Sequence, residues 1–411
     1  MGQALVIAWL ALAFIVTATL LLAQRSLLAR GGPTSRRRGG TPLPVSVLKP
    51  LRGADTDLEA NLTTLFRQDH PEFEVLLGAA DADDPALDVA RRVAAAHPHV
   101  PSQVIADARR VGLNPKVNNL ANLARHARHD VLVVSDSNVA APPGHLSDLA
   151  SRLAAPGTGL VSSPFRASAP RGAGATLGAA LESLQLNTFV MGGTAGLTLL
   201  GGVCCVGKTM AFRRADLDRV GGFSFLARHL AEDQVAGVEF SRAGLGVTVD
   251  ATVIDNVLGP LTVRDFCARH LRWARIRRWV APAGYAAEFL ANPLACAIAA
   301  LVALPPHVGV GCAAALIAFR CVCDAAMERR VGVARPLWSY PLLLALKELL
   351  IAGLWIVPWF HRGVSWRGHR FRVGPRTRLE RTDTPTPDPN AVFPDLVLDG
   401  DAEGDPVAAT A

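Results

Sequence analysis

The sequence lacks the patterns that mark several classes of protein. It has no zinc-binding spacing and no recognisable RNA-binding signature, so nucleic acid is disfavoured as a partner although the net charge of the 411 residues is +7. The 7 cysteines are an odd number. Four of them lie in apolar runs, at Cys296, Cys312, Cys321 and Cys323. This usage indicates reduced thiols that face the cytoplasm and argues against a disulfide framework.

Charge is missing from residues 4–23, which form an uninterrupted apolar segment. A helix that crosses a bilayer needs about 20 such residues. A secretory signal peptide would have a shorter apolar core after a basic residue, whereas here the arginines follow the segment, beginning with Arg25. Because positive flanks stay in the cytoplasm, we expect the N-terminus outside and the next domain inside.

Apolar residues are abundant in the rest of the chain. The mean hydropathy is +0.27, and together with the basic charge it indicates a membrane surface or a phosphate-rich substrate. Residues 289–304 and 308–323 predict a membrane hairpin that turns at Pro305 and Pro306. Segment 337–360 is also apolar, but as a full span it would put the basic residues 361–372 outside, against the positive-inside trend. We therefore predict that segment 337–360 is re-entrant or interfacial.

Strand and helix patterns alternate over residues 45–139. The pattern predicts strands near 45–49, 73–80, 103–105 and 131–135, with amphipathic helices between them. The last of these strands is an uninterrupted apolar run, which is typical of a fully buried strand in a parallel sheet. Strands joined through helices imply right-handed crossovers, so we predict an α/β domain with a mostly parallel sheet.

Two carboxylates follow strands of this sheet, Asp81 and Asp136. In open α/β sheets ligands bind beyond the carboxyl ends of the strands. There Asp136 can meet a metal ion and, through it, a phosphate. Alternatively, Asp136 caps the next turn through its own side chain. Two acids at neighbouring strand ends are less easily explained as independent caps.

Two further stretches carry chemistry. Asp233 and Glu232 open a predicted helix, where acids complement the helix dipole or serve a reaction. Residues 263–280 are basic and aromatic, and the unit Arg-x-x-Arg-Trp occurs twice, at 269–273 and 275–279. Arginines three apart share a helix face, and guanidinium groups grip phosphate oxygens. The alternative is a juxtamembrane basic belt against anionic lipid, and both can hold on different helix faces.

These stretches form an ordered set of motifs from residue 44 to residue 280, and a further short motif lies at 366–372. The motifs are Val-Ser-Val-Leu-Lys-Pro-Leu-Arg-Gly (45–53), Glu-Val-Leu-Leu (74–77) before Asp81-Ala-Asp-Asp-Pro, Gly-Leu-Asn-Pro-Lys-Val-Asn-Asn-Leu (112–120), Asp136-Ser, Ala-Glu-Asp (231–233) and Arg269-x-x-Arg272-Trp273. In order and spacing the set resembles the ceramide glucosyltransferases, within the A-type inverting glycosyltransferases.

The resemblance implies a fold, a reaction and a site. The fold is the glycosyltransferase A-type, a Rossmann-like α/β domain with a mostly parallel sheet. The implied reaction moves a hexose, glucose in this family, from a UDP-sugar to the hydroxyl of a lipid such as ceramide, by single displacement with inversion. The implied divalent cation is Mg²⁺ or Mn²⁺. The implied setting is a multi-pass protein of the bacterial inner membrane whose catalytic domain is cytoplasmic.

The resemblance also assigns roles to residues. Asp81 contacts the uridine, Asp136 contacts the metal and diphosphate, and Asp233 is the general base. The leaving diphosphate is bound by Arg269, Arg272 and Trp273. The donor pocket is lined by Lys49 and Lys116. The chain then divides into a transmembrane helix (1–24), a basic linker (25–44), a catalytic domain (45–280), a membrane region (281–375) and a disordered tail (376–411).

Departures from the family pattern leave alternatives open. The metal motif is Asp136-Ser-Asn138 rather than Asp-x-Asp, so Asp83 or Asp84 can be considered as a further ligand. Hopanoid-associated bacterial glycosyltransferases share the runs at 271–275 and 366–372 and imply N-acetylglucosamine as the sugar. A processive polysaccharide synthase would share the three acids but needs more spans than four. A non-catalytic membrane scaffold would have no reason to place acids at strand ends.

Overall fold

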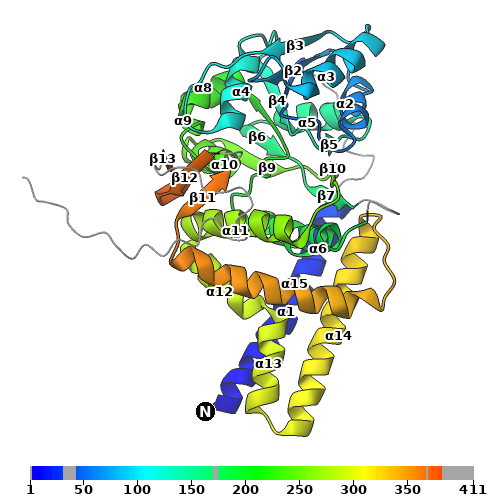
Figure 1. Cartoon of the computed structure of the whole chain (residues 1–411), viewed down its shortest axis with the longest axis vertical. Helices are drawn as coiled ribbons and strands as arrows, with labels where there is room; N and C mark the ends of the chain where they lie inside the picture. Colours follow the sequence, from blue (N-terminus) through cyan, green and yellow to red (C-terminus); the bar gives the residue numbers. More distant parts are fainter. Residues whose placement is uncertain (1, 31–42, 170–174, 367–368, 382–411) are drawn as a thin grey trace, which may run out of the picture.

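An α/β domain and a group of apolar helices occupy opposite ends of the molecule (Figure 1). The computed structural model describes residues 2–30, 43–169, 175–366 and 369–381. Most of the predicted basic linker lies outside these residues, as does the predicted tail beyond residue 381. The predicted fold class, an A-type glycosyltransferase domain with apolar helices near both ends of the chain, is confirmed.

The main sheet has seven strands in the order β3-β2-β1-β4-β8-β6-β9. Their bounds are β1 Val45–Pro50, β2 Phe73–Ala79, β3 Ser102–Ala106, β4 Val131–Ser135, β6 Thr158–Ser162, β8 Thr209–Arg213 and β9 Gly246–Val249. Strands β1 to β4 are mutually parallel, as predicted. Strand β8 is antiparallel to both β4 and β6, so the sheet is mostly rather than wholly parallel. Every residue of β4 is buried, in agreement with its apolar run.

Helices cover both faces of this sheet, and local capping sets where they begin. These helices are α2 (Leu58–Phe66), α3 (Pro85–Ala96), α4 (Pro115–Ala124), α5 (His145–Leu153), α8 (Arg214–Arg219), α9 (Gly222–Leu226) and α10 (Glu232–Arg242). Asp84 and Asn114 accept hydrogen bonds from the first turns of α3 and α4, each with a proline directly after the cap. The first turn of α4 therefore starts at the carboxyl edge of the sheet.

A second layer connects the α/β domain to the apolar helices. It contains the small sheet β5-β10-β7, with β5 Val139–Ala140, β7 Phe165–Ser168 and β10 Ile254–Val257. It also contains α6 (Leu177–Gln185), the π-helix η3 (Leu186–Val190), α7 (Met191–Leu199) and α11 (Val263–Val280). Helix α11 lies across the molecule between the two ends (Figure 1). Its start is fixed by a capping box between Thr262 and Asp265.

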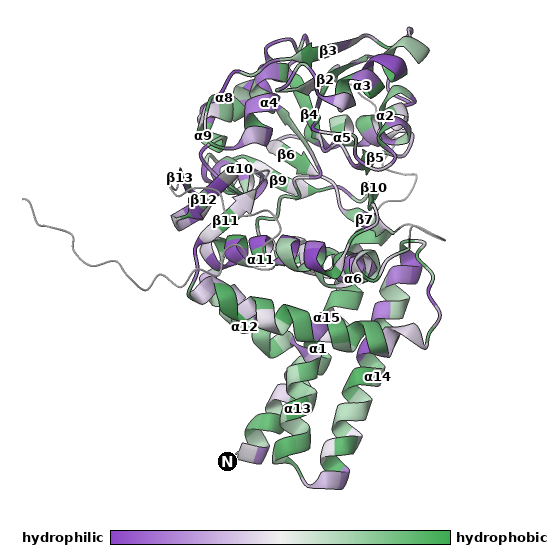
Figure 2. Ribbon diagram, in the orientation of Figure 1, coloured by the Kyte–Doolittle hydropathy of each residue, from purple (hydrophilic) through white to green (hydrophobic). Residues whose placement is uncertain are grey.

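The apolar helices are α1 (Gly2–Ala29), α12 (Pro282–Glu288), α13 (Pro293–Ala303), α14 (Pro306–Arg330) and α15 (Ser339–Ile356). The short 3-10 turn η4 (Phe289–Ala291) lies between α12 and α13, and a second one, η5 (Val357–Trp359), follows α15. By length and composition, three helices among the described residues can cross a membrane, or up to four if the bent pair around Asn292 counts as one span. Figure 2 shows that hydrophobic residues dominate these helices. The predicted hairpin at Pro305 and Pro306 is confirmed, because α13 and α14 pack against each other there.

The charged residues in the centre of α15 face protein and not lipid. Lys347 is fully buried and forms an ion pair of 2.9 Å with Glu348. Helix α14, which contacts α15, carries a second buried pair, Arg320 with Asp324 at 2.9 Å. Pairing is what makes buried charges tolerable in an apolar setting. The two charges in the apolar segment 337–360 are therefore part of the contact between helices.

The chain returns to the α/β domain after α15. It forms the sheet β11 (Gly363–Trp366), β12 (His369–Val373) and β13 (Leu379–Arg381), with the turn η6 (Pro375–Thr377) before β13. The prediction of a tail from residue 376 is corrected here, because residues 376–381 complete this sheet. The Leu230 backbone N–H donates to the Thr377 carbonyl at 2.8 Å, which ties the sheet to the segment before α10.

Candidate active site

A cavity of about 1640 Å³ opens at the carboxyl ends of β1, β2 and β4 and extends to α11. Most of the predicted site residues lie in its wall although they are far apart in the sequence. The predicted residues found there are Asp81, Lys116, Asp136, Asp233, Arg269, Arg272 and Trp273. The three acids that the sequence singled out therefore share one cavity.

Lys49 is the exception, because it lies behind the cavity and not in its wall. It is fully buried, and its Nζ donates to the Val139 carbonyl at 3.0 Å and to Ser135 Oγ at 3.3 Å. Burial lowers the pKa of Lys49 to about 7, with the nearby Asp136 carboxylate opposing the shift. The prediction that Lys49 lines the pocket is corrected: Lys49 braces the strand ends that carry Asp136.

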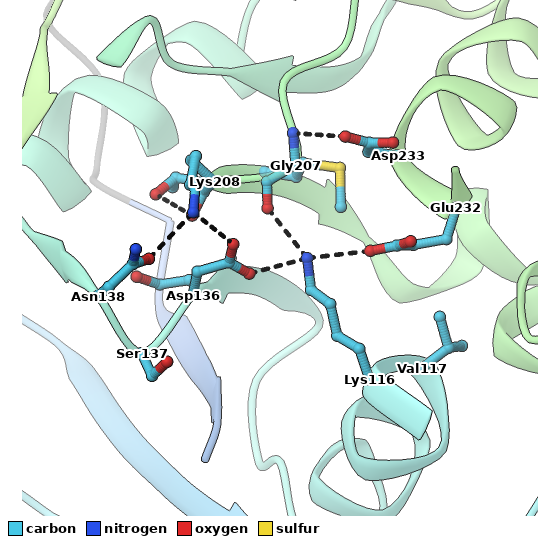
Figure 3. Close-up of polar contacts among 12 residues, drawn as sticks. Lys116, Val117, Asp136, Ser137, Asn138, Gly207, Lys208, Glu232 and Asp233 are labelled. Atoms are coloured by element: carbon cyan, nitrogen blue, oxygen red, sulfur yellow. Dashed lines mark hydrogen bonds and ion pairs between the residues drawn. The ribbon is translucent and has the colours of Figure 1, made fainter. Parts of the chain in front are cut away.

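Asp136 lies between two ammonium groups at the end of β4 (Figure 3). Its Oδ1 is 2.8 Å from Lys116 Nζ, and its Oδ2 is 3.2 Å from Lys208 Nζ. Burial alone would raise the pKa of Asp136, but the two lysines outweigh it and hold the pKa well below its usual range. Asp136 is therefore an ionised carboxylate under all physiological conditions.

Lys208 is a site residue that sequence reasoning missed. Besides Asp136, its Nζ donates to Asn138 Oδ1 at 3.0 Å. Asn138 occupies the place where an Asp-x-Asp motif would put its second carboxylate, so here a lysine approaches an amide instead. Burial lowers the pKa of Lys208, and Asp136 opposes that shift. The only sequence signal was a lone lysine between an apolar run and the strand β8.

The acids at the start of α10 have different environments (Figure 3). Glu232 binds Lys116 Nζ at 2.9 Å and accepts a bond from Asn114 Nδ2 at 3.2 Å. Lys116 thus bridges Glu232 and Asp136. Asp233 Oδ2 instead accepts the backbone N–H of Gly207 at 2.9 Å. This close approach needs a glycine, because a Cβ at position 207 would overlap the Asp233 carboxylate.

The surroundings of Asp233 disfavour the ionised form of its carboxyl group. Burial raises the pKa of Asp233 to about 6, and the neighbouring Glu232 carboxylate adds to the shift. The Lys116 ammonium and the N–H groups of Gly207 and Gln234 act in the opposite direction. A carboxylate with a pKa near neutrality is suited to accept and release a proton.

Helix α11 brings cations to the side of the cavity that faces the apolar helices. Arg269 Nη1 donates to Glu182 Oε1 at 2.9 Å, and His270 Nε2 lies 2.9 Å from Glu182 Oε2. Glu182 is fully buried in α6, and sequence reasoning missed it. Trp273 packs edge-on against His270, with ring centroids 5.5 Å apart. The first Arg-x-x-Arg-Trp unit, rather than the second, contributes its two arginines and its tryptophan to the wall.

A divalent cation at Asp136 would take the place of an ammonium group, because Lys116 and Lys208 each pair with one oxygen of this carboxylate. Within the described ranges, no group of three or more His, Cys, Asp or Glu side chains could hold a metal ion. Mg²⁺ commonly uses one or two carboxylates and completes its shell with substrate phosphates and water, and Asp136 is an ionised carboxylate in the cavity wall. Asp84 does not extend this set, because its carboxylate accepts the N–H groups of Gly53 and Ala86.

A mostly parallel sheet whose strand ends hold carboxylates, faced by a basic helix, defines an A-type glycosyltransferase. Residues 5–379 match the model of Glycosyl transferase family 21. The chain belongs to this family.

Curated relatives agree with this assignment. The chain is 27% identical over 240 residues to ceramide glucosyltransferase 1 of Caenorhabditis elegans, an alignment that covers 57% of this chain and 49% of that protein. It is 21% identical over 469 residues to the ceramide glucosyltransferase of Candida albicans, with 80% and 86% covered. The chain spans about half the length of the first of these relatives. The resemblance to ceramide glucosyltransferases is confirmed.

Solved structures show more distant likeness. The mannosyltransferase PcManGT from Pyrobaculum calidifontis, in complex with GDP-Man and Mn²⁺, is 19% identical, with a TM-score of 0.46 over 84% of this chain and 98% of that one. Staphylococcus aureus TarS 1–349 in complex with UDP-GlcNAc is 13% identical, with a TM-score of 0.38 over 80% and 96%.

Proposed function

We propose that the protein transfers a hexose, glucose in the first instance, from a UDP-sugar to the hydroxyl of a membrane lipid such as ceramide. The observation that carries the proposal is the shared cavity, in which Asp233, the Lys116–Asp136–Lys208 group and Arg269 converge beside apolar helices. Membership of Glycosyl transferase family 21 and the ceramide glucosyltransferases among the relatives support the choice of substrate class.

The reaction is a single displacement at the anomeric carbon. The Asp233 carboxylate takes the proton of the lipid hydroxyl, and the hydroxyl oxygen forms a bond to the anomeric carbon. The bond from that carbon to the diphosphate oxygen breaks, and its electron pair leaves with UDP. Configuration inverts because the attack comes from the face opposite the leaving group. The pKa of Asp233, about 6, lets it act as a base at neutral pH.

Cations of the cavity stabilise the leaving diphosphate. Lys116, Lys208 and Arg269 lie in the wall and offer hydrogen-bond donors to phosphate oxygens. Asp136 would hold a divalent cation, Mg²⁺ or Mn²⁺, which supplies further positive charge to the diphosphate when it is bound. Asp81, at the end of β2, is proposed to contact the uridine, and Arg272 and Trp273 to complete the diphosphate site.

The acceptor is proposed to be a lipid because one side of the cavity is continuous with the apolar helices. Val190, Thr194 and Cys204, in and after η3 and α7, belong to the wall. Helix α7 packs against α1, whereas Leu197 and Leu200 at its end are exposed. A lipid can thus keep its chains in the bilayer while its hydroxyl reaches Asp233. In this arrangement the α/β domain faces the cytoplasm of a multi-pass inner-membrane protein.

A second candidate is transfer of N-acetylglucosamine to a hopanoid. The observation in its favour is that Arg370 and Phe371, from the run shared with the hopanoid-associated enzymes, belong to the cavity wall. A processive polysaccharide synthase is disfavoured, because the described residues offer at most four candidate spans for a polymer channel.

The test is an assay of product identity. Membranes that contain the protein are incubated with labelled UDP-glucose or UDP-N-acetylglucosamine, with ceramide or hopanoid as acceptor, and lipid products are identified by mass spectrometry. Asp233→Asn should lower turnover by about 10²–10⁴-fold, because general-base catalysis is worth that much, while UDP-sugar binding survives. Glu239→Gln, on the same helix and paired with Arg242, is the matched control. Absence of any lipid product, or full turnover of Asp233→Asn, would overturn the proposal.

A further inference from the structure

The sheet β11-β12-β13 has no role in the reaction described so far, yet it lies beside the start of α10 (Figure 1). It follows the last apolar helix and carries the run 366–372, of which residues 367–368 lie outside the described part. Arg370, Phe371 and Arg381 of this sheet belong to the cavity wall. The question is what this late segment does for a site whose acids come from the α/β domain.

Hydrogen bonds tie the sheet to the four residues that precede Glu232 and Asp233. The Thr377 carbonyl accepts the Leu230 N–H at 2.8 Å, and the Leu379 N–H donates to the Arg228 carbonyl at 2.8 Å. The side chain adds a third bond, because Thr377 Oγ1 accepts the Ala231 N–H at 3.2 Å. Ala231 is the residue directly before α10. Thr377 therefore holds the backbone two residues from Asp233.

The backbone of Thr377 is itself in an unfavourable conformation. Its φ is 62°, and the φ of Arg376 is 53°, both in the left-handed region that costs a β-branched or long side chain energy. Thr377 is also fully buried. Such conformations persist when the surroundings over-determine them, and they concentrate at functional sites. The strained conformation of this turn places Thr377 where it can form its hydrogen bonds with Leu230 and Ala231.

Apolar packing joins the same sheet to the other segments of the site. Phe371 and Leu230 belong to one buried cluster, against which Leu113 and Ile276 pack. Leu113 precedes the cap of α4, which carries Lys116, and Ile276 lies in α11 after Arg272. One cluster thus contacts the segments that hold the proposed base, the bridging lysine and the phosphate-binding arginines.

We propose that Thr377 is a positioning residue for Asp233, and that the sheet β11-β12-β13 is a structural part of the active site. Through Leu230 and Ala231, Thr377 sets where the first turn of α10 begins and so where the Asp233 carboxylate meets the acceptor hydroxyl. This inference rests on the proposed function for its kinetic test, but the contact itself can be measured without turnover.

The experiment replaces Thr377 in the full-length protein. Thr377→Val keeps the shape and removes the hydroxyl, and Thr377→Ser keeps the hydroxyl. Thr63→Val, the control, removes a hydroxyl that donates to the Glu59 carbonyl on the exposed side of α2. Loss of one such bond predicts a kcat about threefold to tenfold lower for Thr377→Val, with the KM for UDP-sugar within about twofold of the parent. Thr377→Ser should recover most of kcat, and Thr63→Val should leave it unchanged. Amide hydrogen exchange of residues 228–235 should become faster in Thr377→Val alone.

The outcomes separate this inference from the proposed function. If the parent transfers no sugar, the proposed function fails, and hydrogen exchange alone decides whether Thr377 holds the segment. If the parent is active and Thr377→Val matches it in kcat and exchange, the inference is overturned. Equal losses of kcat, UDP affinity and thermal stability would also overturn it, because they indicate a merely structural role. If Thr377→Val cannot be purified, Thr377→Ala removes the same hydroxyl and is compared with Thr377→Ser in the same way, with the same changes in kcat and exchange expected.

Discussion

At the scale of single residues, the surroundings of Asp233 suit the role of general base that is proposed for it. Burial and the Glu232 carboxylate raise the pKa of Asp233 to about 6, above its ordinary value of 3.8. Because the folded-state pKa is the higher one, ionisation of Asp233 costs folding free energy as the pH rises from about 4 through about 6. Reactivity and stability therefore oppose each other at this side chain, as is common for catalytic groups.

The pKa of Asp233 makes a prediction about pH. The proposed base acts only when it is ionised, so kcat/KM, which reports the free enzyme, should be level above pH 7 and fall about tenfold per pH unit below the pKa of about 6. Glu232→Gln removes a neighbouring negative charge, so the acid limb of its profile should move to lower pH. Transfer rates measured between pH 4.5 and 8.5, values chosen to bracket the pKa by roughly 1.5 to 2.5 units, test both. An acid limb that Glu232→Gln leaves in place would contradict the assignment.

Lys208 explains how the site manages without Asp-x-Asp. Where the second acid would lie, Asn138 accepts a bond from Lys208 and donates one to Asn256 Oδ1 at 2.8 Å. A second carboxylate would add negative charge beside the proposed diphosphate site, whereas the lysine adds positive charge. The sequence showed that Asn138 replaces the second acid of the family motif, but it did not show that the Lys208 ammonium group lies beside that asparagine.

At the scale of secondary-structure elements, the contact of α6 with α11 holds Arg269, one of the arginines proposed to bind phosphate. Glu182 of α6 accepts from both Arg269 and His270 and has no exposed surface. Burial would raise the pKa of Glu182, but the bond from His270 and the charge of Arg269 lower it. Glu182 is therefore a buried anion that orients one face of α11 toward the cavity.

This contact predicts the effect of Glu182→Gln. The variant keeps a hydrogen-bond acceptor but loses the charge that holds Arg269, so UDP should bind roughly tenfold more weakly, in the range for a lost bond to a charged group. Asp233 and Lys116 are untouched, so kcat at saturating donor should change less than affinity. Calorimetric titration with UDP measures the first quantity and a saturation assay the second. Unchanged UDP affinity in Glu182→Gln would show that Arg269 needs no such support.

At the scale of the whole molecule, the segments before and after α15 are tied to parts of the protein outside the apolar helices. Arg166 Nη1, in β7 of the small sheet, donates at 2.8 Å to the carbonyl of Val331, which lies between α14 and α15. At the other end, β11 and β12 lead to the turn that binds Leu230. In Figure 1 α15 runs across the direction of α13 and α14, while the N-terminus and the turn between those two helices lie at the far end. These contacts support the prediction that α15 enters and leaves on one side, although its length and composition would suffice for a span.

Cysteine accessibility tests this topology. In a background without the 7 native cysteines, single cysteines at Gly2 or His307 should react with a membrane-impermeant thiol reagent from outside intact cells. Cysteines at Trp338 or His361 should react only after the membrane is opened, since they flank α15 on the side of the α/β domain. Labelling of His361→Cys in intact cells would make α15 a full span and would contradict the contacts described above.

Short-range patterns made much of this predictable. The alternation of strands and helices, the acids after β2 and β4, and the proline turn between α13 and α14 depend on residues close in sequence. Such features can be predicted because the spacing of apolar side chains differs between helices and strands, and because short polar side chains bond to the neighbouring backbone. For the same reason the α/β class and the carboxyl-edge cavity followed from the sequence.

Long-range contacts decided the rest. Segments far apart in the chain decide three features of the site. They decide whether Lys49 faces the cavity or the strand ends behind it, and whether Lys208 reaches Asp136. They also decide whether residues 376–381 leave the domain or return to it. No local pattern specifies them, because each depends on the balance of burial, pairing and packing in the assembled molecule. The sequence by itself determined which elements form and where reactive groups end them. Only the tertiary structure decided which of those groups meet.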